Sequence, residues 1–261
     1  MKPFKLLQIT DPHLGGKPGT PLLGMDTDKS LREVLECIRK DEKPDLIVAT
    51  GDISSDGSVP SYIRFLKIMD EYFPDLPLAW LAGNHDDGAH MVSVAGHPID
   101  LSHSQGAWHF VFLDSHVPGQ TGGRFSDTEL ARLDEELAAN THKPCIVFLH
   151  HQPVLIDSDW IDQYALANAH DFFTVLDKYP NVKVVGWGHI HQEFESSHKG
   201  ISLLATPSTC VQFEPRSKAF KVSEEMPGYR IFDLFDDGAF KTEVKRVALQ
   251  SYTIDFTSTG Y

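Results

Sequence analysis

Short apolar runs alternate with segments of helical periodicity along the chain. The runs predict strands over 5–10, 45–50, 78–82, 108–113, 145–149, 182–185 and 201–205, and a closing hairpin over 229–247 that turns at Asp236-Asp237-Gly238. Between the runs, apolar residues recur three and four positions apart around Leu35, Phe65 and Leu133, as on one face of an amphipathic helix. A further helix is expected over 165–179.

The order of these elements indicates the fold class. Strands that alternate with helices imply βαβ units, and the later strands imply a second sheet. We therefore predict an α/β fold with α+β character, in which two mixed sheets pack face to face and helices form the outer layers. Ser30 with Glu33, and Ser126 with Glu129, have the spacing of capping boxes. No linker or repeat is visible, so we expect a single domain over 1–261.

Polar motifs directly follow five of the apolar runs. They are Asp11-Pro12-His13, Gly51-Asp52, Gly83-Asn84-His85-Asp86, His150-His151 and Gly188-His189-Ile190-His191. In open α/β sheets, ligands bind beyond the carboxyl ends of the strands, so we expect these motifs to converge at one end of the molecule. In three motifs a glycine precedes the polar residue, where it suits a tight backbone turn.

The side chains of these motifs suit a pair of divalent metal ions. The candidate ligands offer carboxylate, amide and imidazole groups without a thiolate: Asp11, His13, Asp52, Asn84, His150, His189 and His191. This donor set favours iron or manganese, with zinc or cobalt as further candidates. The seven ligands suit two ions that share one carboxylate, and Asp52 is the candidate for the shared position. The expected chemistry is attack of a metal-activated water on phosphorus.

Other residues near these motifs have different expected roles. His85, next to Asn84, would point at a bound phosphate, where an imidazole can protonate the leaving oxygen or stabilise its charge. We interpret His151 as a structural neighbour of a ligand, because ligating histidines commonly have such partners. The stretch 160–164 (WIDQY) either stacks on an adenine or serves internal packing or an oligomer contact, and 155–169 forms either a lid or an ordinary surface loop.

Charge and cysteine content restrict the partners and the compartment. A net charge of -14 argues against non-specific nucleic-acid binding and against anionic membrane surfaces. Two divalent ions outweigh Asp11, Asp52 and a shared hydroxide, so the site would stay about one unit positive and could hold a phosphodiester. Cys37, Cys145 and Cys210 are widely spaced, which favours free thiols. Without a visible signal peptide or membrane-spanning run, we expect a cytoplasmic monomer or homodimer.

The five motifs resemble those of the calcineurin-like metallophosphoesterases, which are D-x-H, G-D, G-N-H-[DE], H and G-H-x-H. Almost end to end, the chain also resembles the bacterial 3′,5′-cyclic AMP phosphodiesterases of class III. The supporting segments are 6–11 (LLQITD), 23–25 (LGM), 45–52 (DLIVATGD), 205–213 (ATPSTCVQF) and the closing Gly260-Tyr261. The resemblance implies a four-layer metallophosphoesterase sandwich with a dinuclear metal site, which hydrolyses cAMP to 5′-AMP and so lowers its intracellular level.

The resemblance also implies roles for individual residues. One metal would be bound by Asp11, His13, Asp52 and His191, and the second by Asp52, Asn84, His150 and His189. The substrate would lie against His13, Asp52, Asn84, His85, His150 and His191, with His85 as the catalytic histidine. The chain departs from many relatives at Ser55, where they have an aspartate that can orient this histidine. Asp56 and Asp86 are both candidates for that task here.

Two other functions fit the same motifs. A broader metallophosphoesterase would act on 2′,3′-cyclic nucleotides, glycerophosphodiesters or phosphomonoesters with the same ligands. Metal motifs do not contact the base, so they do not separate cAMP from cGMP either. A non-catalytic scaffold is disfavoured, because such proteins typically lose ligands and this chain keeps all seven together with His85.

Overall fold

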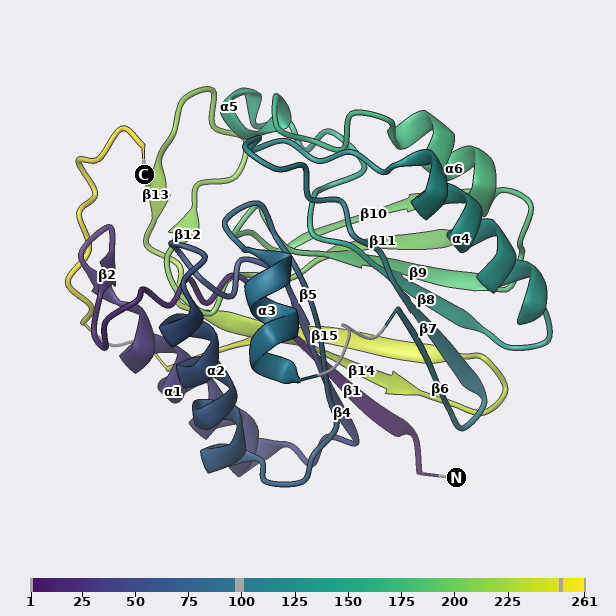
Figure 1. Cartoon of the computed structure of the whole chain (residues 1–261), viewed down its shortest axis with the longest axis horizontal. Coiled ribbons are helices and arrows are strands. Elements are labelled where there is room, and N and C mark those ends of the chain that lie inside the picture. The colour runs from purple at the N-terminus through teal and green to yellow at the C-terminus, as the bar shows by residue number, and fades with distance from the viewer. Residues whose placement is uncertain (1, 97–100, 249–250, 261) are drawn as a thin grey trace.

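Two β-sheets pack face to face in the computed structural model, and helices cover the outer face of each sheet (Figure 1). The structure describes residues 2–96, 101–248 and 251–260. One sheet has the order β15-β14-β1-β4-β5, from β1 (Phe4–Ile9), β4 (Leu46–Thr50), β5 (Leu78–Leu81), β14 (Gly228–Leu234) and β15 (Phe240–Arg246). The other has the order β10-β11-β9-β8-β7-β6, from β6 (Ser102–Gln105), β7 (Trp108–Phe112), β8 (Cys145–Phe148), β9 (Val182–Trp187), β10 (Phe194–His198) and β11 (Ile201–Ala205). The predicted four-layer α/β architecture is confirmed.

The central strands of each sheet are parallel, which places their carboxyl ends at one edge. β1, β4 and β5 run parallel, as do β7, β8, β9 and β11, whereas β14, β15, β6 and β10 pair antiparallel. The helices are α1 (Thr27–Asp41), α2 (Val59–Tyr72), α3 (Gly88–Ala95), α4 (Asp127–Ala139), α5 (Asp159–Asp162) and α6 (Ala169–Leu176). Two short pairs, β2 (Pro21–Leu22) with β3 (Met25–Asp26) and β12 (Gln212–Phe213) with β13 (Val222–Ser223), lie outside the sheets. Among the described residues, no helix combines the length and apolarity needed to cross a membrane.

Alternation of side chains along the strands divides the core into layers. Leu6 faces the space between the sheets, whereas its neighbour Leu7 faces the helices of the first sheet. In β8, Phe148 faces the inter-sheet layer and Val147 faces the helices of the second sheet. Because successive side chains of a strand point to opposite faces, a strand that is covered on both faces must be apolar throughout. This is why the predicted strands appear as continuous apolar runs.

The structure corrects one predicted helix start and supports the other. α1 begins at Thr27, and the Asp26 side chain accepts from the Lys29 N–H at 3.0 Å. Ser30 is therefore inside the helix, and its hydroxyl donates to the Thr209 carbonyl at 2.6 Å. Its prediction as a cap was wrong because this long-range hydrogen bond has no signal in the local sequence. Ser126 does cap α4, as predicted.

The helix predicted over 165–179 is shorter than expected. α6 covers only Ala169–Leu176, because the Asn168 amide makes two 3.0 Å hydrogen bonds to the backbone of Phe125 and its own backbone is not helical. The closing hairpin forms as predicted, with its turn between Leu234 and Phe240. Short or mostly exposed elements such as β10 and the β12–β13 pair escaped prediction, because few apolar positions mark them.

Phe148 connects the two sheets, and its removal should destabilise the fold. Its ring lies 5.9 Å from Phe112 in the same sheet and 6.4 Å from Phe232 in the opposite sheet, measured between centroids. Phe148→Ala should lower the free energy of unfolding by about 3–5 kcal/mol, as for other buried phenylalanines. Urea unfolding followed by circular dichroism measures this, with Ile63→Ala on the exposed face of α2 as the control. A loss no greater than that of the control would contradict the inter-sheet role.

Candidate metal centre

Five loops meet at the carboxyl ends of the parallel strands. They follow β1, β4 and β5 in one sheet and β8 and β9 in the other, and they contain the predicted motifs. Backbone hydrogen bonds join them: the Asp11 N–H donates to the Gly51 carbonyl at 3.1 Å, and the His13 N–H donates to the backbone carbonyl of Asp52 at 2.9 Å. In the second sheet, the Gly188 N–H donates to the backbone carbonyl of His150 at 3.2 Å. Residues far apart in the sequence are thereby held in one cluster.

Asp52 lies at the middle of this cluster. Its Oδ2 is 3.6 Å from His13 Nε2 and 3.3 Å from His150 Nε2, and it accepts no hydrogen bond from the described residues. Its Oδ1 accepts from the His85 backbone N–H at 2.8 Å. Buried polar atoms without a partner are costly. This carboxylate is therefore placed to bind a cation next to His13 as well as a cation next to His150.

On one side of Asp52 lie Asp11, His13 and His191. The Nε2 atoms of the two histidines are 3.1 Å apart, and His191 Nε2 is 3.5 Å from Asp11 Oδ1. All three side chains are buried. Together with Asp52, they form a compact set of two carboxylates and two imidazoles, which is a suitable donor set for one divalent ion.

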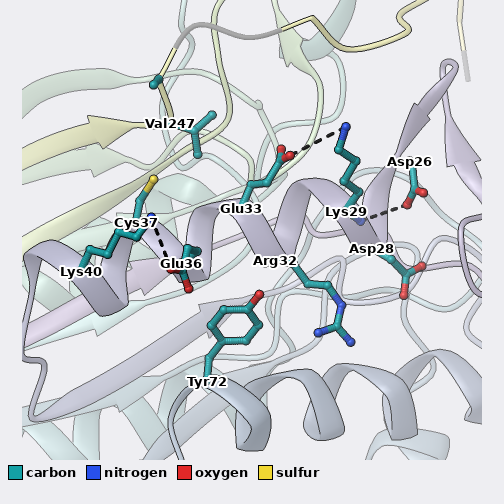
Figure 2. A pocket seen from close by; sticks show the side chains of 11 residues that line it. Asp26, Asp28, Lys29, Arg32, Glu33, Glu36, Cys37, Lys40, Tyr72 and Val247 are labelled. Carbon is teal, nitrogen blue, oxygen red and sulfur yellow. Dashed lines mark hydrogen bonds and ion pairs between the residues drawn. The ribbon is translucent and has the colours of Figure 1, made fainter.

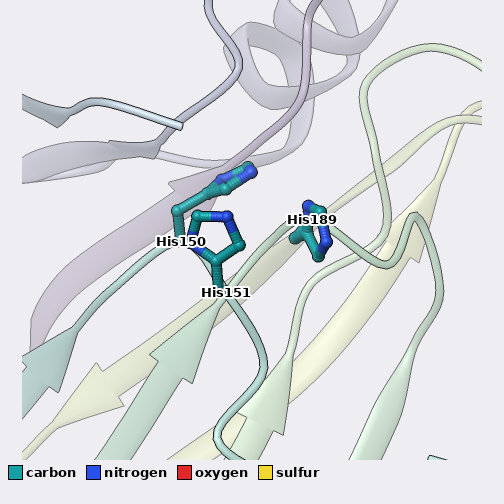
Figure 3. Close-up of side chains that lie close together, drawn as sticks. All are labelled: His150, His151 and His189. Carbon is teal, nitrogen blue, oxygen red and sulfur yellow. The ribbon is translucent and has the colours of Figure 1, made fainter. Parts of the chain in front are cut away.

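On the other side lie Asn84, His150 and His189. The Asn84 Oδ1 is 3.2 Å from His150 Nε2. His189 is almost fully buried, yet neither of its ring nitrogens has a hydrogen-bond partner among the described residues. Figure 3 shows His189 beside His150 and His151. With Asp52, these residues offer a second donor set for a divalent ion, so the cluster suits two metals.

Backbone carbonyls select the ring nitrogen that faces the cluster. Nδ1 of His150 donates to the Thr50 carbonyl at 2.8 Å, and Nδ1 of His191 donates to the Val211 carbonyl at 2.8 Å. With Nδ1 held by a carbonyl, each ring turns its Nε2 toward the cluster, where this nitrogen could bind a metal. Val211 lies in 205–213, one of the segments that support the resemblance. A backbone carbonyl is present in every residue, so the sequence could not show that this one accepts a hydrogen bond from His191.

The charge states of the buried groups also suit metal binding. Burial lowers the pKa of His13 and of His189 well below the ordinary value, so both rings are neutral. Burial alone would raise the pKa of Asp52, but the neighbouring His150 and His85 outweigh it and hold that pKa well below its usual range. Burial would likewise lower the pKa of His150, but Asp52 raises it to about 9, so a proton occupies this ring where a metal would replace it.

The backbone of the cluster is strained at the ligand positions. Asp11, His13, Asp52, His189 and His191 have φ values of 52°, 48°, 48°, 64° and 49°, in the left-handed region. Each costs about 1–2 kcal/mol relative to ordinary backbone. Gly83, before Asn84, and Gly188, before His189, are required because neighbouring side chains lie close to their backbone. A Cβ on Gly83 would overlap Asp52, and a Cβ on Gly188 would overlap Thr10. Strain of this kind persists where the surroundings impose it, and it concentrates at functional sites.

The two carboxylates considered for orienting His85 both bond to loop groups. Asp86 accepts from the backbone N–H groups of Ile53, Ser54 and Gly83 at 3.1, 2.9 and 2.8 Å. Burial and the charge of Asp52 raise its pKa to about 7. Asp86 thus ties the loop after β4 to the loop after β5. Asp56 accepts from the Gly16 N–H at 2.9 Å and from Ser54 and Ser58. Orientation of the His85 ring by either residue stays a prediction.

The remaining sequence candidates lie around the cluster. The half-buried His85 ring is in edge-to-face contact with His13, with 5.0 Å between centroids. Both ring nitrogens of His151 are bonded elsewhere, to Ser115 at 2.8 Å and to the Thr121 carbonyl at 3.1 Å. Trp160 packs against Phe213 and Phe220, which is the internal packing considered for it. Closure of the 155–169 segment over the site stays a prediction.

Some supporting residues were not anticipated from the sequence. The Thr10 hydroxyl donates to Asp11 Oδ2 at 2.7 Å, and the Ser208 hydroxyl donates to the Asp11 carbonyl at 2.8 Å. Ser208 is 197 positions away from Asp11 in the sequence. Both residues lie in segments that support the resemblance, 6–11 and 205–213, but the resemblance assigned neither of them a role.

A groove of about 680 Å³ lies apart from this cluster, along α1 (Figure 2). Two lysines of the groove pair with its glutamates: Lys29 lies 3.8 Å from Glu33, and Lys40 lies 3.4 Å from Glu36. The groove contains none of the predicted ligands. We therefore place the candidate chemistry at the strand ends rather than here.

Comparisons with known proteins identify the family and the fold of this chain. The chain is 40% identical over 259 residues to the 3′,5′-cyclic adenosine monophosphate phosphodiesterase CpdA of Pseudomonas aeruginosa, which covers 98% of this chain and 94% of the relative. It is 41% identical over 264 residues to the protein of that name from Vibrio vulnificus, covering 99% and 95%. Among solved structures, a dimetal phosphatase from Danio rerio shares the fold, with a TM-score of 0.64 at 17% identity over 95% of this chain and 100% of that one. Residues 4–193 match the family described as calcineurin-like phosphoesterase, and the chain belongs to this family.

Proposed function

We propose that this chain is a single-domain phosphodiesterase that opens 3′,5′-cyclic AMP to 5′-AMP and so lowers the intracellular level of cAMP. The observation that supports it most directly is the position of Asp52 Oδ2 between His13 and His150, at 3.6 and 3.3 Å from their Nε2 atoms. This geometry supports two-metal chemistry on phosphorus. The choice of substrate is supported by near full-length similarity to enzymes named for cAMP.

Two divalent ions would occupy the cluster, and we propose iron or manganese ahead of zinc or cobalt. Asp11, His13, Asp52 and His191 would hold one ion, and Asp52, Asn84, His150 and His189 the other. The absence of thiolate from this set supports these metals. When bound, the ions would supply Lewis acidity that holds the phosphodiester and lowers the pKa of a water molecule.

The substrate phosphate would lie against the open side of the cluster. His13, Asp52, Asn84, His85, His150 and His191 would line it. Asn84 and His85 are only half-buried, unlike Asp52, which supports their contact with substrate. As the bond from phosphorus to the 3′ oxygen breaks, His85 would donate a proton to that oxygen. The Asp52 carboxylate holds the backbone of His85, which positions the ring beside His13.

We further propose that the protein acts in the cytoplasm as a monomer or homodimer, without nucleic-acid or membrane partners. The net charge of -14 supports this, because such a surface repels polyanions and anionic lipids. A small cyclic nucleotide is compatible with that charge, because the two metals would make the site locally positive.

Purified protein supplied with Mn²⁺ or Fe²⁺ should convert 3′,5′-cAMP to 5′-AMP, and a chelator should stop the reaction. The panel should include 2′,3′-cAMP, 3′,5′-cGMP and bis(p-nitrophenyl) phosphate, with products separated by chromatography. Chelator-sensitive formation of 5′-AMP in preference to the other products supports the proposal. Cleavage of the artificial diester with 3′,5′-cAMP left intact would keep two-metal chemistry and reject this substrate.

Asp52→Asn should abolish turnover and reduce the bound metal, because a neutral amide removes the charge that both metals would share. Metal content after gel filtration and turnover of cAMP measure the two effects. Glu42→Gln is a matched control, since Glu42 is also a buried carboxylate, paired with Lys5 and Lys245 and distant from the strand ends. Wild-type activity in Asp52→Asn would remove this residue from the site.

His85→Ala should retain both metals and lower turnover about 10²–10⁴-fold, the usual contribution of a general acid or base. Turnover and metal content are measured on the same preparation. His90→Ala, at an exposed histidine of α3, serves as the control and should behave as the wild type. Loss of one metal in His85→Ala would instead identify His85 as a ligand.

A further inference from the structure

His151 lies among the candidate ligands, but its own bonds point away from them. Its ring is completely buried, 4.9 Å from the His150 ring and 4.7 Å from the His189 ring, between centroids (Figure 3). The Thr121 carbonyl can only accept, so Nε2 of His151 carries the proton and donates to it at 3.1 Å. Nδ1 then accepts from the Ser115 hydroxyl at 2.8 Å. Both ring nitrogens are used, which leaves neither for a metal.

His189 differs from the other imidazoles of the cluster in how it is held. Carbonyls hold His150 and His191 through Nδ1, at 2.8 Å in each case. His189 has no hydrogen bond to either ring nitrogen within the described part of the chain. Its ring orientation must therefore come from packing, and His151 is in direct contact with it.

The loop between β7 and α4 clamps the His151 ring. Ser115 and Thr121 bond to its two nitrogens from this loop, and a Cβ on Gly123 would overlap the ring itself. Ser115 is completely buried, so its hydroxyl is not shared with solvent. The ring can therefore neither rotate nor shift without breaking a buried hydrogen bond or meeting the backbone of Gly123.

We propose that His151 is a positioning residue for one metal only: clamped by Ser115 and Thr121, it orients His189 at the second site. The inference rests on the proposed two-metal function. It explains why a buried histidine stands among ligands with both nitrogens engaged elsewhere. It also predicts that the site with Asp11, His13 and His191 is unaffected. Within the described part of the chain, the ring contacts and hydrogen bonds of the His151 side chain go to His150, His189, Ser115 and Thr121 instead.

The test measures metal binding to the apo protein, independently of catalysis. Co²⁺ is titrated into chelator-treated protein, and its absorption spectrum and two dissociation constants are recorded. Ser115→Ala removes one bond to His151, and His151→Phe keeps a ring but removes both bonds. Each variant should weaken one of the two Co²⁺ sites about 10–100-fold, the usual effect of losing a partner of a ligating histidine, and leave the other unchanged.

The chain offers a matched pair of controls at the far end of the second sheet. His109 is buried near the start of β7, and its ring nitrogens bond to Ser104 at 2.9 Å and to Glu136 at 3.1 Å. His109→Phe and Ser104→Ala therefore make the same chemical changes away from the strand ends and should leave both Co²⁺ constants unchanged. In a His189→Ala background, Ser115→Ala should have no further effect on Co²⁺ binding.

Each other outcome overturns the inference in a distinct way. Unchanged constants in Ser115→Ala and His151→Phe would deny any positioning role. Equal weakening in the His109 controls would indicate a general effect of packing. Complete loss of one site in His151→Phe, with Ser115→Ala unchanged, would make His151 a ligand. Wild-type protein that binds fewer than two Co²⁺ ions would reject the two-metal proposal, and the inference with it; if His151→Phe does not fold, Ser115→Ala still decides.

Discussion

The candidate site depends on one buried carboxylate that faces both sheets. Asp52 lies in the loop after β4 of the first sheet, yet its Oδ2 lies 3.3 Å from Nε2 of His150, which follows β8 of the second sheet. The face-to-face packing of the sheets therefore determines whether two ligand sets can share this oxygen. Aromatic contacts contribute to that packing: the Phe148 ring contacts Phe112 in its own sheet and Phe232 in the opposite sheet. The apolar core and the polar cluster are two consequences of the same arrangement of strands.

Much of the local structure serves to keep this polar cluster buried. Five ligand positions adopt left-handed backbone, and glycines are required where a side chain would overlap Asp52 or Thr10. The buried imidazoles of His13 and His189 stay neutral, while the Asp52 carboxylate stays ionised. The unpaired Asp52 Oδ2 and His189 ring nitrogens, buried beside this charge, are unfavourable in the absence of a cation. A bound metal would therefore stabilise the fold at the point where the backbone is most strained.

Buried and accessible side chains of the site suit different tasks. The buried ones suit metal binding, and the accessible ones suit contact with a substrate. Asp11, His13 and His191 are buried, and a hydroxyl supports Asp11 while a carbonyl supports His191, whereas Asn84 and His85 are half-buried. A rigid buried set suits ligands, whose geometry must not change during a reaction. A half-buried imidazole suits proton transfer, because it must meet the substrate. His151 belongs with the rigid part, although it stands next to His150 in the sequence.

The sequence by itself determined the buried strands of the two sheets, the layered α/β class and the placement of the candidate ligands after those strands. It could do so because strands covered on both faces must be apolar, and because parallel strands present their carboxyl ends together. It could not determine that Ser30 lies inside α1, that Asn168 shortens α6, or that Ser208 supports Asp11 from 197 positions away. It favoured a structural role for His151, but it could not identify the groups that hold this ring or the ligand that it contacts. Only the tertiary structure decided these points, because hydrogen bonds between distant segments produce no periodic pattern of residues along the sequence.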